Sequence, residues 1–267
     1  MRRDIADIAL SGRLFAPHYA VAERCRCVAA AAMLRGTPDP KGRAVSQLLH
    51  GEDFAVLDIA GGWAWGYALA DHYVGYVAMA ALGAPVEPTH RVTAPLALLF
   101  EAPDIKSPVL AEWPMGARFT ATVEGDFLAA GDGYIHRRHA RGIGEADADP
   151  VAVAERLLGA PYRWGGRGAG GIDCSGLVQL ALGLAGIDAP RDSDMQRALG
   201  HEIAPDAPLA RGDLIFFPGH VGLMADGTRL LHANAHAMAV TIEPLADVVA
   251  RLATSCDQPI VARRRLK

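Results

Sequence analysis

The sequence has few of the features that mark disulfide-rich, nucleic-acid-binding or membrane-spanning proteins. Its 267 residues include only four cysteines, too few for the disulfide framework of a small secreted domain. The net charge is −4, so no excess of positive charge is available for a nucleic acid. No apolar run approaches the roughly 18 residues of a membrane-spanning helix. We therefore expect neither nucleic acid nor membrane among the partners.

The N-terminal residues also lack the uninterrupted apolar stretch of a secretory signal. Asp4 and Asp7 follow two arginines, and the apolar stretch between Ile5 and Leu10 is short and acidic. This pattern predicts a cytoplasmic protein. Residues 1–20 are expected to form an N-terminal arm with one short helical piece.

Hydrophobic residues make up 51% of the chain, which is enough for a sizeable core. Over residues 21–84, short alternating runs are broken by Gly, Asp and Pro, a pattern that predicts an all-β domain. A second segment with the same ingredients covers 88–142, so we expect a weak duplication of a small barrel. Cys25 and Cys27 stand at no recognised ligand spacing from a histidine and are interpreted as ordinary strand residues.

A polar stretch, Gly142–Pro150, predicts a linker, and the pattern after it predicts helices followed by an antiparallel sheet, an α+β order. Asp149 is expected to cap the first helix, with Pro150 at its first position. The predicted helices are Val151–Leu158, Ser175–Leu184 and Ser193–Leu199. The predicted strands are Asp213–Phe217, His220–Ala225, Arg229–Ala233, Val240–Glu243 and Ile260–Arg264.

One cysteine is placed as a nucleophile would be. Cys174 lies between Asp173 and Ser175, after a glycine-rich run and at the start of a predicted helix. The positive end of a helix favours a thiolate, the nucleophilic form of cysteine. A buried core cysteine is the alternative, but its polar flanks argue against an apolar site.

A cysteine nucleophile needs a base, and the base needs a group that orients it. His220 and His232 lie on successive predicted strands joined by a turn. A three-residue loop, Ala225–Gly227 with Gly227 in the left-handed region, would set the two histidines opposite each other on one face. A two-residue loop would put them on opposite faces. The catalytic hypothesis therefore predicts a loop with an odd number of residues.

Together these motifs resemble the NlpC/P60 cysteine peptidases. The resemblance rests on five ordered motifs: Tyr162-Arg163-Trp164-Gly165-Gly166, Asp173-Cys174-Ser175-Gly176, Pro190-Arg191-Asp192-Ser193, Arg211-Gly212-Asp213-Leu214-Ile215-Phe216-Phe217, and His220 with His232. It implies a multidomain chain of two small all-β, SH3-like (SH3b) barrels, 21–84 and 88–142, followed by an α+β papain-like catalytic domain, 147–267. The combination is similar to that of γ-D-glutamyl-L-diamino acid endopeptidases.

The resemblance also implies roles for individual residues. The catalytic residues would be Cys174 as nucleophile, His220 as base, His232 as its orienting partner, and Tyr162 at the oxyanion beside the Cys174 N–H. Packing against the helix is an equally weighted alternative for Tyr162. The substrate-binding residues would be Asp173 and Tyr73 on a free L-Ala amine, Ser175 and Ser193 on the D-Glu carboxylate, and Trp164 and Arg191 close by. A helix cap is the alternative for Asp173, and a buried ion pair is favoured for Arg191.

The implied reaction is hydrolysis of the bond between γ-D-Glu and the diamino acid in peptidoglycan stem peptides. The expected substrate is L-Ala-γ-D-Glu-meso-diaminopimelate from cell-wall recycling, with no cofactor and no metal. Some relatives carry an acidic residue where this chain has Val45, so the preference for a free amine is an open point. Three alternatives stay open: an amidase or acyltransferase on another γ-glutamyl-type substrate, a non-catalytic muropeptide-binding protein, and redox chemistry between Cys174 and Cys256.

Overall fold

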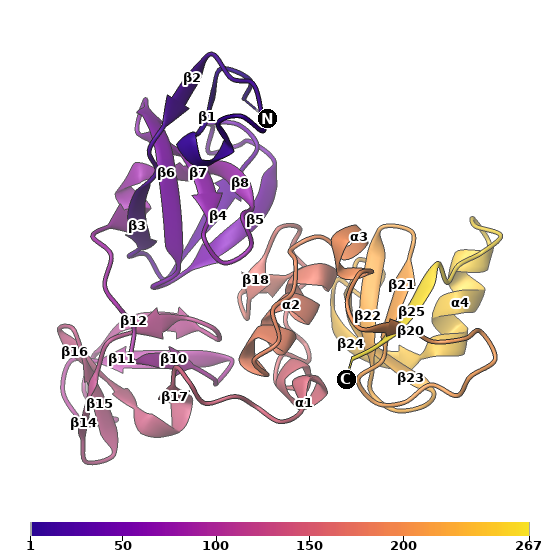
Figure 1. Ribbon diagram of the computed structural model, residues 1–267. Coiled ribbons are helices and arrows are strands. Elements are labelled where there is room, and N and C mark those ends of the chain that lie inside the picture. The colour runs from indigo at the N-terminus through magenta and orange to yellow at the C-terminus, as the bar shows by residue number, and fades with distance from the viewer. Residues whose placement is uncertain (1, 267) are drawn as a thin grey trace. The chain divides into compact units, whose positions relative to one another are not determined.

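The computed structural model describes residues 2–266 and divides into two compact units, 1–145 and 146–267. The division falls inside the stretch predicted as a linker. Figure 1 shows strands through the first unit (indigo to magenta) and a mixture of helices and strands in the second (pink to yellow).

The first group of strands forms one seven-stranded sheet in the order β5-β4-β8-β7-β6-β3-β9. Its alternating side chains bury Leu34, Phe54 and Val77 in one core, and Cys25 and Cys27 lie buried in β3, as predicted for strand residues. The elements are β3 (Glu23–Cys27), β4 (Ala31–Arg35), β5 (Ala44–Leu49), β6 (Asp53–Ala60), β7 (Trp63–Ala68), β8 (Val74–Ala78), η2 (Met79–Ala81) and β9 (Leu82–Gly83).

The second group of strands has its own core, around Val92, Ala97 and Ile135. It consists of a three-stranded sheet, β13-β10-β17, and a five-stranded sheet, β12-β11-β16-β15-β14. The elements are β10 (His90–Val92), β11 (Leu96–Phe100), β12 (Val109–Pro114), β13 (Arg118–Phe119), β14 (Thr122–Glu124), β15 (Phe127–Ala130), β16 (Gly133–His136), η3 (Arg137–His139) and β17 (Ala140–Gly142).

Specific contacts join the two strand groups within the first unit. The Arg118 N–H donates to the His50 carbonyl at 2.8 Å. The His50 ring stacks on Trp113 with centroids 4.1 Å apart. Gly51 has a φ of +75°, and a Cβ there would lie 1.9 Å from the Arg118 carbonyl oxygen. Only glycine permits both this backbone conformation and this close approach.

The N-terminal arm folds onto the first strand group. The predicted helical piece is a 3-10 turn, η1 (Ile8–Leu10), and the rest of the arm contains β1 (Ile5–Asp7) paired in parallel with β2 (His18–Ala20). Tyr67 donates its hydroxyl to Asp7 at 2.6 Å. The Arg2 guanidinium lies over the Trp65 ring, 5.3 Å from its centroid. These contacts fix the arm as part of the first unit.

The second unit has the predicted order of helices before an antiparallel sheet. Its six-stranded sheet runs β20-β25-β21-β22-β23-β24, and α2 packs against β22 and β23. The elements are α1 (Pro150–Glu155), β18 (Arg167–Gly168), β19 (Gly171–Ile172), α2 (Cys174–Leu184), α3 (Ser193–Gln196), β20 (His201–Glu202), β21 (Leu214–Phe217), β22 (His220–Met224), β23 (Arg229–Asn234), β24 (Ala239–Pro244), α4 (Leu245–Ala253) and β25 (Ala262–Arg265).

Helix ends in this unit follow the local sequence. Asp149 caps α1 through the Val151 N–H at 2.8 Å, with Pro150 at the first position, as predicted. Helices α1 and α3 are each shorter than expected, and α4 was not predicted. None of the described helices has the length and apolar character needed to cross a membrane.

Candidate active site

Cys174 is the first residue of α2, where the sequence predicts the nucleophile. Asp173 caps the helix by accepting the Gly176 N–H at 2.8 Å, which bears out the alternative given for this residue. The Cys174 side chain is buried, and the backbone N–H groups of Val221 and Ser175 both act on its sulfur. Because Val221 follows His220 on β22, the helix start and the histidine strand meet at this sulfur.

Burial decides the ionisation of this thiol. It raises the pKa of Cys174 to about 11, and the Asp173 charge adds to the rise, while the N–H groups of Val221 and Ser175 work against it. The prediction that the helix end holds a resting thiolate is therefore wrong. The loss of hydration around the buried sulfur outweighs the helix dipole.

His220 and His232 meet on one face of the sheet. His220 Nε2 lies 2.8 Å from His232 Nδ1, a hydrogen-bond distance, and the ring centroids are 5.0 Å apart. The prediction of an odd loop that places both rings on one face is confirmed. Since Nε2 of His220 is engaged with His232, Nδ1 is its ring nitrogen available for a proton from a thiol.

The loop itself lies one residue later than predicted. Leu223 pairs with Leu231 and Met224 with Leu230, so the turn is centred on Asp226–Thr228. Asp226 fixes this register because one carboxylate oxygen accepts the N–H groups of Thr228 and Arg229. Continued along the strands, the pairing sets Gly222, not His220, across from His232. Gly227 also has no positive φ, so its predicted left-handed conformation is wrong.

Gly222 leaves the space that the second histidine occupies. A Cβ at Gly222 would lie 2.9 Å from the Leu230 side chain and 3.0 Å from the Cβ of His232. Real Cβ atoms seldom approach so closely, so a side chain here would push His232 aside. The sequence-based interpretation did not single out this glycine, although its position two residues after His220 was visible.

Burial also holds His220 in its neutral form. It lowers the pKa of His220 to about 3, and the charge of a protonated His232 would lower it further. Burial likewise lowers the pKa of His232. The resting site therefore pairs a neutral thiol with a neutral imidazole, which can accept a proton only as the sulfur attacks.

Glu243 and Arg251 extend the histidine pair, and neither was predicted. His232 Nε2 lies 2.8 Å from Glu243 Oε1. The Arg251 guanidinium donates to both Glu243 oxygens, at 2.8 Å and 3.0 Å. Arg251 was missed because α4 was missed. The apolar spacing of Leu245, Val248, Val249 and Leu252 was the signal that could have revealed this helix.

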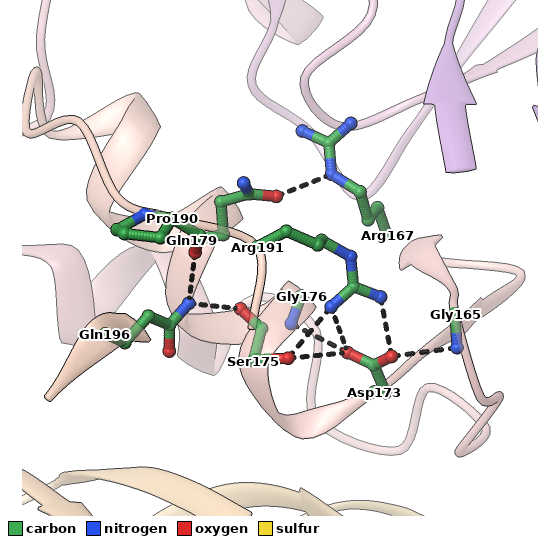
Figure 2. A network of polar contacts seen from close by, with 9 residues as sticks. All are labelled: Gly165, Arg167, Asp173, Ser175, Gly176, Gln179, Pro190, Arg191 and Gln196. Atoms are coloured by element: carbon green, nitrogen blue, oxygen red, sulfur yellow. Dashed lines mark hydrogen bonds and ion pairs between the residues drawn. The ribbon is translucent and has the colours of Figure 1, made fainter. Parts of the chain in front are cut away.

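A buried polar network surrounds the helix start, as Figure 2 shows. Arg191 donates to both Asp173 oxygens, at 2.6 Å and 2.9 Å, and to the Ser175 hydroxyl at 2.8 Å. The Gly165 N–H donates to Asp173 at 2.8 Å. Together with the Gly176 N–H and the two bonds from Arg191, this makes four hydrogen bonds to the Asp173 carboxylate. A carboxylate has about four acceptor sites, so all of them are used. Arg191 is 2% exposed, so the favoured ion-pair interpretation is confirmed.

The glycine-rich segment 165–171, which precedes α2, packs tightly against the start of this helix. A Cβ at Gly166 would lie 2.2 Å from the Gly171 carbonyl oxygen, and one at Gly176 would lie 2.5 Å from the Gly166 carbonyl oxygen. The glycines therefore let two backbone segments approach α2 closely enough for Gly165 to reach Asp173. Their function is close packing around the nucleophile.

Of the other predicted site residues, three belong to the unit 146–267 and one belongs to the unit 1–145. Tyr162 is half-buried, and burial together with the Cys174 charge raises its pKa to about 12, which places it near the nucleophile. Trp164 is 54% exposed, and Ser193 is a half-buried residue at the start of α3. Tyr73 belongs to the unit 1–145, where it packs against the first core. The substrate contacts assigned to these residues stay predictions.

The two acids close to Val45 in the sequence, Glu52 and Asp53, are both engaged elsewhere. Asp53 forms an ion pair with Arg24 at 2.7 Å. Val45 packs against the first core. Glu52 is 5% exposed, and its carboxylate accepts the Leu49 N–H at 2.9 Å. Within residues 2–266, no group of three or more His, Cys, Asp or Glu side chains is arranged to hold a metal ion.

Comparison with known proteins identifies two parts of the chain. Residues 159–255 match the model of the NlpC/P60 family, and residues 34–82 match the bacterial dipeptidyl-peptidase SH3 domain. Dipeptidyl-peptidase 6 of Lysinibacillus sphaericus is 40% identical over 96 residues, which are 36% of this chain and 35% of that protein. Gamma-D-glutamyl-L-lysine dipeptidyl-peptidase of Bacillus subtilis is 31% identical over 109 residues, 38% of this chain and 36% of that protein. The chain thus spans about a third of the length of these relatives.

The solved structures show the same fold over nearly the whole chain. An NlpC/P60 family protein from Bacillus cereus superposes with a TM-score of 0.76 at 21% identity, covering 91% of this chain and 99% of that one. An NlpC/P60 endopeptidase from Photobacterium damselae gives a TM-score of 0.59 at 15% identity, covering 90% and 70%.

A family match was found for one of the two predicted SH3 barrels, so the SH3 identity of 88–142 stays a prediction. In the catalytic part, the matched residues include the thiol, both histidines and the helix that carries the thiol. The chain therefore contains an NlpC/P60 domain in residues 159–255 and a bacterial SH3 domain in residues 34–82.

Proposed function

We propose that this chain is a cysteine endopeptidase that hydrolyses the bond between γ-D-Glu and a diamino acid in peptidoglycan stem peptides. The observation that carries the proposal is that the Val221 N–H, next to His220 on β22, acts on the Cys174 sulfur, while His220 Nε2 lies 2.8 Å from His232 Nδ1. A buried thiol beside a neutral imidazole suits nucleophilic attack on a carbonyl carbon. The name of the Bacillus subtilis relative supplies the γ-D-glutamyl bond.

In the first half of the reaction, the Cys174 sulfur attacks the γ-carbonyl carbon of D-Glu while Nδ1 of His220 takes the thiol proton. The Cys174 N–H at the start of α2 and the Tyr162 hydroxyl would donate to the oxyanion, since the first N–H groups of a helix have no partner inside it. The tetrahedral intermediate then collapses. The bond to the diamino acid nitrogen breaks, and His220 returns its proton to that nitrogen.

In the second half, water releases the thioester. His220 takes a proton from the water as the water oxygen attacks the thioester carbonyl, and the proton passes to the Cys174 sulfur as the C–S bond breaks. The products are the free diamino acid and L-Ala-γ-D-Glu with a free γ-carboxyl group. The enzyme returns to a neutral thiol and a neutral imidazole.

We propose that the substrate is L-Ala-γ-D-Glu-meso-diaminopimelate with a free N-terminus. The dipeptidyl-peptidase names of two relatives support release of an N-terminal dipeptide. Asp173 already accepts bonds from Arg191, Gly165 and Gly176. The Asp173 carboxylate therefore has no acceptor site left for the substrate amine, and we propose that Ser175 and Ser193 face the D-Glu carboxylate.

A role in cell-wall recycling in the cytoplasm completes the proposal. A peptidase that requires a free N-terminus acts on trimmed, soluble peptides rather than on intact wall. Cell fractionation with an antibody against the native protein tests the location. A predominantly extracellular or wall-bound protein would contradict the recycling role while leaving the peptidase activity intact.

Mass spectrometry of the reaction mixture tests the activity. The purified protein and its Cys174→Ala variant are incubated with the tripeptide and with its N-acetylated form. We expect the wild type alone to release diaminopimelate, and only from the free-amine form. Cleavage of both forms would remove the amine requirement, and cleavage by Cys174→Ala would exclude the mechanism. A new amide in place of free diaminopimelate would indicate acyl transfer.

A further inference from the structure

The histidine pair does not end at His232 but continues to a carboxylate held by an arginine. Glu243 stands on β24, and Arg251 projects from α4 to hold both of its oxygens. The side chain of His232 is 1% exposed and that of Glu243 is 21% exposed, so the chain runs from the buried site toward the surface. The catalytic set of nucleophile, base and orienting histidine ends at His232 and gives no role to Glu243 or Arg251.

The carboxylate settles which nitrogens of the two rings carry protons. Although burial opposes it, Arg251 and His232 hold the pKa of Glu243 below its usual value, so this group is ionised. An ionised carboxylate can only accept hydrogen bonds. His232 must therefore carry its proton on Nε2, and because burial keeps this ring neutral, its Nδ1 is an acceptor.

The tautomer of His232 in turn fixes the tautomer of His220, the catalytic base. If His232 Nδ1 is an acceptor, His220 must donate to it from Nε2 at 2.8 Å. A neutral imidazole has one N–H, so Nδ1 of His220 then carries the lone pair. That nitrogen must take the proton from the thiol. In the opposite tautomer, His220 Nδ1 would carry a proton and the ring could not act as a base toward Cys174.

We propose that Glu243 is a positioning residue that fixes the tautomers of His232 and His220 and so keeps the lone pair of His220 on Nδ1. Arg251 assists by holding the carboxylate in place. The proposal rests on the proposed peptidase function for its kinetic part, but the tautomers exist whether or not the protein cleaves this substrate.

Two substitutions separate hydrogen-bond acceptance from charge. Glu243→Gln keeps a carbonyl oxygen that can accept from His232, whereas Glu243→Ala removes the acceptor. The chain also offers a matched control, because the two Glu155 oxygens accept from Arg211, at 2.9 Å and 2.9 Å, rather than from a histidine. Glu155→Ala therefore reports the cost of losing a glutamate–arginine pair alone.

The test combines two readouts on the full-length protein. Nitrogen-15 NMR of histidine-labelled protein reads the tautomer of each ring, and tripeptide cleavage gives kcat and KM. In wild type and Glu243→Gln we expect both rings protonated on Nε2. In Glu243→Ala we expect mixed tautomers and a kcat lower by roughly 10- to 100-fold, with KM little changed, by analogy with the carboxylates that orient metal-bound imidazoles. Glu155→Ala should match wild type.

Two results would overturn the proposal. One is a wild-type His220 protonated on Nδ1. The other is a Glu243→Ala protein that keeps the wild-type tautomers. If the wild type cleaves no tripeptide at all, the proposed function fails, but the NMR comparison still decides the role of Glu243. A Glu243→Ala protein that does not fold leaves the decision to the wild-type and Glu243→Gln spectra.

Discussion

At the scale of single residues, the reactivity of the site depends on a thiol that burial keeps protonated. Cys174 and His220 both have a pKa moved by burial toward the neutral form, upward for the thiol and downward for the imidazole. Attack by the sulfur and transfer of its proton to His220 must therefore occur together. A resting ion pair of thiolate and imidazolium is not expected.

Alkylation of the free enzyme by iodoacetamide should follow this raised pKa. With a pKa of about 11, about a thousandth of Cys174 is thiolate at pH 8, and the fraction grows about tenfold with each pH unit. The rate at Cys174, followed by peptide mass spectrometry, should rise steeply from pH 8 to pH 10. A rate already high and flat between pH 5 and pH 8 would indicate a resting thiolate. The half-buried Cys256 serves as an internal comparison.

The ion pair between Asp173 and Arg191 should matter more for stability than pairs on the surface. Removing Arg191 leaves a buried carboxylate without its counter-charge, so Arg191→Met should lower the free energy of unfolding by about 3–5 kcal/mol. The exposed pair of Arg137 with Asp126 is the control, and Arg137→Met should cost at most about 1 kcal/mol. Urea unfolding measures both. Equal losses would contradict the structural assignment of Arg191.

At the scale of elements, the active site depends on how α2, β22 and β23 are set against one another. The start of α2 could be predicted because Asp173, Cys174 and the glycines before them form a local capping pattern. The common face of His220 and His232 followed from loop parity. The register itself depends on the hydrogen bonds of the Asp226 carboxylate, which local sequence patterns do not resolve. Glu243 and Arg251 depend on β24 and α4 packing together, a tertiary relation.

Gly222 provides a test of this packing. A Cβ there would press on Leu230 and His232, so Gly222→Ala should lower stability by about 1–3 kcal/mol and reduce kcat by displacing His232. Gly183 lies within α2 with nothing within 4 Å of the position of a Cβ. Gly183→Ala should instead stabilise the protein by about 0.5–1 kcal/mol and leave kcat unchanged. Thermal unfolding and tripeptide cleavage compare the two variants, and an unaffected Gly222→Ala enzyme would refute the packing argument.

At the scale of the whole molecule, the chain consists of two units joined by an exposed stretch. Residues 143–146 are exposed, whereas Asp147 is held by the Leu184 carbonyl and by Arg156. The connector at 85–89 is secured differently, because Thr120 donates its hydroxyl to the Glu87 carbonyl at 2.8 Å. The stretch 143–146 is also held to the first unit, because the Ile143 N–H donates to the Thr89 carbonyl at 2.9 Å and the Glu145 carbonyl accepts from Arg91 at 2.6 Å.

Limited proteolysis should detect the boundary between the two units. A low concentration of a protease of broad specificity should cut first within 143–146 and yield one fragment from each unit, because this exposed stretch lies at the boundary between two compact units. N-terminal sequencing and intact mass identify the site. An initial cut at 85–89 would mean that the contacts between the strand groups are weaker than the structure indicates.

The most direct test of the account is to identify the residue that carries the acyl group. The enzyme is mixed with L-Ala-γ-D-Glu-meso-diaminopimelate, quenched in acid within milliseconds to seconds, and digested for tandem mass spectrometry. We predict an L-alanyl-D-glutamyl thioester on the peptide containing Cys174, which disappears in Cys174→Ala and accumulates when hydrolysis is slowed. Diaminopimelate released without any adduct at Cys174, or an adduct at Cys256 instead, would contradict the assignment of Cys174 as the nucleophile.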